Sequence, residues 1–167
     1  YGENKVQEAL EKWTDIKNKN NNIQLHLIGK LQTNKVKFAL KIFDYIHSLD
    51  SEKLANKIAD EQQKHKKKPK IFIQVNVGNE DQKSGIDKRN LNDFYKFCKN
   101  LNLDIIGTMC IPPNNSNTEK YFSEMNDLNK ELNFKELSMG MSGDYLEAIK
   151  YNATYIRIGS KIFGSRT

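Results

Sequence analysis

The chain has 167 residues, a formal net charge of +6 and no Pro-, Gly- or Ser-rich stretch that would divide it, which fits one domain over residues 1–167. Its densest basic run, residues 64–70, has no aromatic or arginine residues between the lysines, which is typical of a solvated connection and not of a nucleic-acid-binding patch. Cys98 and Cys110 are too few for a disulfide framework or a metal site, and no apolar run approaches the roughly 20 residues that cross a bilayer. We therefore expect a protein of a reducing compartment, the cytoplasm, with no membrane, nucleic-acid or metal partner.

Apolar, β-rich runs recur along the chain and predict strands. They cover residues 23–28, 43–49, 71–77, 103–111, 136–141 and 154–159. Residues 1–4 read as the end of one further strand, which makes about seven. Strands that alternate with helices imply a parallel sheet, either open and doubly wound or closed as an eight-stranded barrel. A barrel would lack one β-α unit at its front.

Between these strands, apolar residues recur at helical spacing, so each stripe can cover one face of the sheet. Residues that favour helix starts stand before three stripes, at Ser51, Asn90 and Asn117. The stripes consist of Val6, Leu10, Trp13 and Ile16; Val36, Leu40 and Phe43; Leu54 and Ile58; Leu91, Phe94, Phe97 and Leu101; and Phe122, Met125, Leu128 and Leu132.

The last two predicted strands each run into glycine and serine where a helix can start. Ser142 follows the first of them, and Gly159 and Ser160 follow the second. Free backbone N–H groups at such turns, together with serine hydroxyls, suit the oxygens of a phosphate. Two turns of this kind on adjacent strands indicate a phosphorylated ligand rather than phosphate transfer.

Two further polar residues lie inside predicted strands. Alternation places Arg157 on the face opposite Ile156 and Ile158, where it either pairs with a neighbouring strand or donates to a ligand above Gly159. His26 fits a satisfied core residue better than an acid–base group. The chain shows no Ser-His-Asp spacing and no Gly-x-Gly-x-x-Gly fingerprint.

Six segments in order along the chain carry a family resemblance. They are residues 1–8 (YGENKVQE), 25–35 (LHLIGKLQTNK), 74–85 (QVNVGNEDQKSG), 107–112 (GTMCIP), 138–142 (SMGMS) and 157–164 (RIGSKIFG). The chain resembles the pyridoxal-phosphate homeostasis proteins, the YggS/PROSC group. The resemblance implies a TIM-type (β/α)8 barrel of the alanine racemase N-terminal-domain type, here missing the first β-α unit, with pyridoxal 5′-phosphate at its mouth.

The resemblance also assigns residues to the cofactor. It implies that Ser142, Gly159 and Ser160 hold the phosphate and that Arg157 lies beside the pyridine nitrogen. A cation there disfavours protonation of that nitrogen and weakens the ring as an electron sink. The same resemblance implies that three residues line the ring or its surroundings: Asn4, His26 and Met109.

The lysine that bonds the cofactor in this family lies on a first strand, in a motif resembling Ala-Val-Ser-Lys-Thr. That strand would precede Tyr1, and no residue of this chain matches it. Lys35 and Lys83 belong to other motifs of the family, so neither is assigned this role.

The resemblance favours a monomeric carrier that binds and delivers pyridoxal 5′-phosphate in vitamin B6 homeostasis, without turnover, to apoenzymes that depend on the cofactor. One alternative is an enzyme of the same fold. Another is a fragment that neither closes its barrel nor bonds the cofactor covalently, because loss of a strand leaves two unpaired edges. A basic nucleic-acid binder would require a steep salt dependence.

Overall fold

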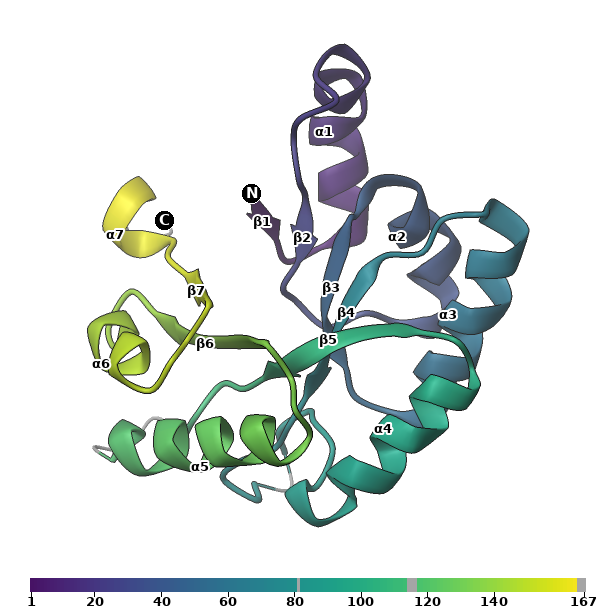
Figure 1. The fold of residues 1–167 in the computed structure, drawn as a ribbon. Helices are drawn as coiled ribbons and strands as arrows, with labels where there is room; N and C mark the ends of the chain where they lie inside the picture. The colour runs from purple at the N-terminus through teal and green to yellow at the C-terminus, as the bar shows by residue number, and fades with distance from the viewer. Residues whose placement is uncertain (81, 114–116, 165–167) are drawn as a thin grey trace.

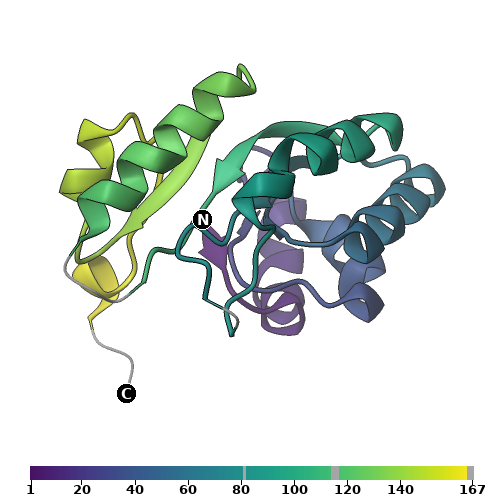
Figure 2. The same cartoon turned by 90° about the horizontal axis from the view of Figure 1, so that it is seen from below.

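The computed structural model describes residues 1–80, 82–113 and 117–164, which form one curved parallel sheet with helices on its outer side (Figures 1 and 2). The strands are β1 (Gly2–Glu3), β2 (His26–Leu27), β3 (Tyr45–Leu49), β4 (Lys70–Gln74), β5 (Asp104–Met109), β6 (Glu136–Met141) and β7 (Tyr155–Arg157). The helices are α1 (Val6–Lys19), α2 (Val36–Ile42), α3 (Glu52–His65), α4 (Leu91–Asn100), α5 (Thr118–Glu131), α6 (Tyr145–Lys150) and α7 (Ser160–Phe163), with 3-10 turns η1 (Thr33–Lys35) and η2 (Lys88–Asn90).

The order of the strands decides between the two predicted architectures. The seven-stranded sheet runs from β1 to β7 in chain order, and each strand pairs in parallel with the next. A doubly wound sheet reverses its strand order at a switch point, which this sheet does not do. The predicted β/α barrel is therefore confirmed, with β1 and β7 as its edge strands on either side of the open part of the curve (Figure 1).

Alternation along the strands sorts side chains into two layers. Ile46, Ile71 and Ile73 are fully buried in the outer core, where the helices pack against the sheet. Tyr45 and Phe72, their neighbours in sequence, belong with Met109 to a separate inner cluster. Burial on both faces explains why these strands appear in the sequence as short, continuous apolar runs.

All three predicted start signals stand directly before a helix, and two of them cap it through their side chains. Ser51 accepts a hydrogen bond from the backbone N–H of Leu54 at 3.3 Å, and Asn117 accepts one from Lys120 at 3.3 Å. α4 begins at Leu91 directly after Asn90, as predicted, but the side chain of Asn90 makes no cap hydrogen bond. Asp87 instead accepts from the backbone N–H of Arg89 at 2.9 Å, so the chain enters α4 through η2.

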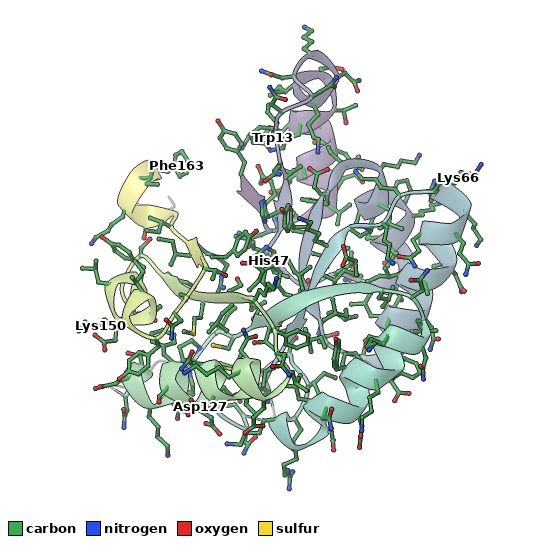
Figure 3. The ribbon with its side chains drawn as sticks, viewed as in Figure 1. Trp13, His47, Lys66, Asp127, Lys150 and Phe163 are labelled. Carbon is green, nitrogen blue, oxygen red and sulfur yellow. The ribbon has the colours of Figure 1, made fainter. Side chains whose placement is uncertain are left out.

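Apolar side chains are exposed next to the edge strand β7. Ile156 on β7 is 39% exposed, Ile149 on α6 is 49% exposed, and Phe163 on α7, labelled in Figure 3, is 80% exposed. This part of the surface adjoins the open side of the barrel. Among the described residues, none of the helices has the length and apolarity needed to cross a membrane.

Gly107 provides a test of the strand packing. A Cβ at this position would lie 1.8 Å from the carbonyl oxygen of Glu136 on the neighbouring strand, so the backbone of β5 or β6 would have to move. We expect Gly107→Ala to lower the free energy of unfolding by about 3 kcal/mol or more, measured by urea denaturation.

Gly143→Ala is the matched control, because its Cβ would meet no atom within 4 Å. Its free energy of unfolding should change by less than about 0.5 kcal/mol. Equal stabilities for the two variants would contradict the described contact between β5 and β6.

Candidate functional site

Four side chains form a hydrogen-bonded series across the inside of the curved sheet, which we call the interior polar chain: His26, His47, Ser138 and Arg157. Nδ1 of His26 lies 3.0 Å from Nε2 of His47, and Nδ1 of His47 lies 2.8 Å from Oγ of Ser138. Arg157 donates from Nη1 to the same Oγ at 2.7 Å. The series therefore connects β2 and β3 with β6 and β7, and Figure 3 shows His47 on the inner side of the curved sheet.

Arg157 is held by two neutral acceptors. Besides the hydroxyl of Ser138, its Nη2 donates to the backbone carbonyl of Cys110 at 2.8 Å. Burial lowers the pKa of the guanidinium, which still carries its charge, and no carboxylate of the described chain forms an ion pair with it. A buried cation without an anionic partner is suited to a ligand acceptor. Arg157 therefore pairs with the neighbouring strand β6 through a hydroxyl and not through a salt bridge, and its donation to a ligand stays a prediction.

Aromatic rings enclose the two histidines. Tyr45 stacks on His26 with 4.1 Å between ring centroids, and Phe72 stacks on His47 at 4.3 Å. Burial lowers the pKa of His26 to about 4 and that of His47 to about 2. Burial, with a hydrogen bond to Tyr45, raises the pKa of Tyr155 to about 12. The rings of His26, His47 and Tyr155 are therefore uncharged at neutral pH.

The turns after β6 and β7 meet at the hydroxyl of Ser142. Its Oγ accepts from the backbone N–H of Gly159 at 3.3 Å and from that of Lys161 at 3.4 Å. Asp144 shapes the first turn by accepting from the backbone N–H of Met141 at 2.6 Å. A Cβ on Gly159 would meet nothing within 4 Å, so there is open space beside these donors.

This donor set fits an anionic group such as phosphate. Both N–H groups at Ser142 now bond to a neutral hydroxyl at long distances. A charged oxygen accepts more strongly than a neutral one, so a phosphate oxygen can replace the hydroxyl as acceptor while Ser142 turns to donate.

Except for Asn4, the predicted site residues lie in the two turns after β6 and β7 and on the inner face of the sheet. Ser142, Gly159 and Ser160 lie in the two turns, where Ser160 begins α7. Arg157 and His26 belong to the interior polar chain, and Met109 is fully buried in the inner cluster.

Asn4 lies apart from this group in the exposed connection between β1 and α1. Its backbone faces Gly29, where an added Cβ would approach the carbonyl oxygen of Asn4 to 2.2 Å. The role of Asn4 beside the cofactor ring stays a prediction.

Neither Ser138 nor His47 was assigned to the site from the sequence. Both are buried polar residues in apolar strands, which is the signal that could have marked them. Their contact joins positions 91 residues apart, which strand patterns alone cannot pair.

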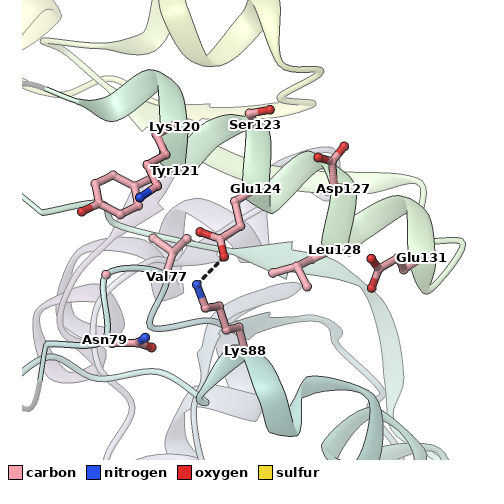
Figure 4. Close-up of a pocket in the computed structure, with 11 residues that line it drawn as sticks. Val77, Asn79, Lys88, Lys120, Tyr121, Ser123, Glu124, Asp127, Leu128 and Glu131 are labelled. Carbon is pink, nitrogen blue, oxygen red and sulfur yellow. Dashed lines mark hydrogen bonds and ion pairs between the residues drawn. The ribbon is translucent and has the colours of Figure 1, made fainter.

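A groove of about 650 Å³ lies elsewhere, between α5 and the loop that follows β4 (Figure 4). Lys88 and Glu124 form an ion pair within it. None of the predicted site residues lines it, so it does not coincide with the interior polar chain or the turns. Among residues 1–80, 82–113 and 117–164, no group of three or more His, Cys, Asp or Glu side chains is arranged to hold a metal ion.

Comparison with known proteins relates this arrangement to a family. The profile of the family described as "Alanine racemase, N-terminal domain" matches residues 1–167. The pyridoxal phosphate homeostasis protein of Aquifex aeolicus is 40% identical over 99% of this chain and 76% of its own length, and that of Pasteurella multocida is 39% identical with the same coverage. The chain belongs to the pyridoxal phosphate homeostasis protein family.

Solved structures agree with this membership. PipY of Synechococcus elongatus, a protein 34% identical to this one, superposes with TM-scores of 0.91 without PLP and 0.89 with PLP bound, over 98% of this chain and 80% of PipY. Alanine racemase of Clostridium difficile 630 is 12% identical with a TM-score of 0.74, over 99% of this chain and 44% of that one, which shows a shared fold. The family resemblance inferred from the sequence motifs of this chain is therefore confirmed.

The buried histidines predict a pH dependence of stability. Unfolded His47 binds a proton near its ordinary pKa of 6.5, whereas the folded protein keeps it neutral down to about 2. The unfolded state therefore binds more protons below pH 6.5, and stability falls as the pH falls. From pH 7 to pH 5 we expect His47 to remove about 2 kcal/mol from the free energy of unfolding, measured by urea denaturation.

His47→Gln should flatten this pH dependence, and His65→Gln, on α3 outside the interior polar chain, is the control that should leave it as in the parent. An unchanged slope in His47→Gln would show that His47 is not held neutral by the fold.

Proposed function

We propose that this protein binds pyridoxal 5′-phosphate at the turns after β6 and β7 and holds it for delivery, as a cofactor carrier. One observation supports this most strongly: the backbone N–H groups of Gly159 and Lys161, which meet at Ser142, directly follow the strand that carries the buried cation of Arg157. Pyridoxal 5′-phosphate carries an anionic phosphate and a basic ring nitrogen, one acceptor for each of these donor groups. The names of its relatives and the PLP-bound PipY structure support the same ligand.

The proposal assigns a role to each part of the site. The phosphate accepts from Ser142 and from the backbone N–H groups of Gly159 and Lys161, with Ser160 beside them. Arg157 donates to the ring nitrogen. His26 and Met109 border the ring from inside the sheet, and Asn4 contributes from the mouth.

The bound cofactor supplies an aldehyde and an electron-withdrawing ring. Arg157 limits how strongly the ring withdraws electrons, because a permanent cation beside the ring nitrogen disfavours protonation of that atom. His26 and His47 are bonded to each other and enclosed by aromatic rings, so both are poorly placed to exchange protons with a substrate. These features support a role without turnover.

The remaining assignments belong to the same proposal. The protein acts as one domain over residues 1–167, as a monomer and in the cytoplasm, where its recipients are apoenzymes that need the cofactor. The free thiols of Cys98 and Cys110 suit a reducing compartment.

Ser142→Ala tests the phosphate contact. Loss of one hydrogen bond to a charged group should weaken binding of pyridoxal 5′-phosphate about tenfold, measured by absorption titration. Ser123→Ala, in the groove beside α5, is the matched control and should bind as the parent does. Equal affinity in all three proteins would argue against the phosphate position, and steady conversion of an amino acid by the loaded protein would favour an enzyme.

A further inference from the structure

The direction of the hydrogen bonds in the interior polar chain follows from Arg157. A guanidinium has five N–H donors and no acceptor, so Oγ of Ser138 must accept at its 2.7 Å contact with Nη1. Ser138 is fully buried, and its hydroxyl carries one hydrogen. The other contact of this hydroxyl is with Nδ1 of His47 at 2.8 Å. The hydroxyl is satisfied only if it donates to that nitrogen.

The direction of the hydrogen bond from Ser138 to His47 also determines which ring nitrogen carries the proton in each of the two histidines. Because Nδ1 of His47 accepts, a neutral ring carries its proton on Nε2, and that group donates to Nδ1 of His26 at 3.0 Å. His26 must then carry its own proton on Nε2. We propose that Arg157 imposes one proton order on the interior polar chain, from Arg157 through Ser138 and His47 to His26, and that His47 is thereby a positioning residue for Arg157.

The reverse order is disfavoured at both ends of Ser138. If Nδ1 of His47 donated, Ser138 would accept twice, and its own hydrogen would have no acceptor in a fully buried position. A doubly protonated His47 would meet the same difficulty and would add a positive charge beside Arg157. Burial, His26 and Arg157 all lower the pKa of His47.

The positioning role concerns the plane of the guanidinium. Nη1 is held by Ser138 and Nη2 by the carbonyl of Cys110, and two fixed nitrogens fix a rigid planar group. The remaining N–H groups then keep a fixed direction toward a ligand. Without an acceptor at His47, the hydrogen of the Ser138 hydroxyl is left unsatisfied, so the Ser138 side chain can turn away from its present rotamer and Nη1 loses a defined partner. This consequence rests on the proposed function, whereas the proton order does not.

The proton order can be read in the ligand-free protein by NMR with ¹⁵N-labelled histidine. We expect a pyridine-type signal for Nδ1 and a pyrrole-type signal for Nε2 in both His26 and His47. The third histidine, His65, is assigned with His65→Gln. Ser138→Ala should release the order and give His47 a mixture of tautomers. A protonated Nδ1 on His47 in the parent protein would overturn the proposal.

Ligand binding tests the positioning role. The probes are pyridoxal 5′-phosphate and benzyl phosphate, which keeps the phosphate but lacks the ring nitrogen. His47→Leu should weaken binding of pyridoxal 5′-phosphate about tenfold and leave binding of benzyl phosphate nearly unchanged. His47→Asn, whose amide oxygen can take the place of Nδ1, should restore binding of pyridoxal 5′-phosphate.

Equal losses for both probes would assign His47 to general packing and contradict the positioning role. If the parent protein bound neither probe, the proposed function would fail, while the NMR spectrum would still decide the proton order.

Discussion

The hydrogen bond from Arg157 to Ser138 is the contact on which the rest of the site depends. It joins β7, the edge strand, to β6, and it gives a buried cation its direction. The hydrogen bond between Ser138 and His47 extends this connection to β3, which lies three strands from β6 in the sheet. A hydroxyl can accept from a cation on one side and donate to an imidazole on the other, and this is why a serine suits the centre of the series.

The barrel makes this arrangement possible by giving each strand two buried faces. The outward face carries the aliphatic residues that pack under the helices, while the inward face holds aromatic rings and the interior polar chain. Arg157 carries the positive charge of the interior polar chain, while His26 and His47 stay neutral. A parallel sheet also places the strand ends together, so the turns that hold Ser142 and Gly159 meet above this interior.

Much of the fold was predictable, because period-two and helical spacing report burial directly. The same alternation correctly placed Arg157 on the face of β7 opposite Ile156. The contact of His47 with Ser138 was not predictable, since it depends on how the sheet curves. The six-residue helix α6 was missed because it is too short to show a stripe.

The central claim is that pyridoxal 5′-phosphate occupies the turns after β6 and β7. Amide ¹H–¹⁵N NMR of the full chain during titration with the cofactor tests it most directly. The account predicts the largest shifts at Gly159, Ser160 and Lys161, with smaller changes along α5. Shifts confined to the groove around Glu124 and Leu128, with none at Gly159–Lys161, would contradict it.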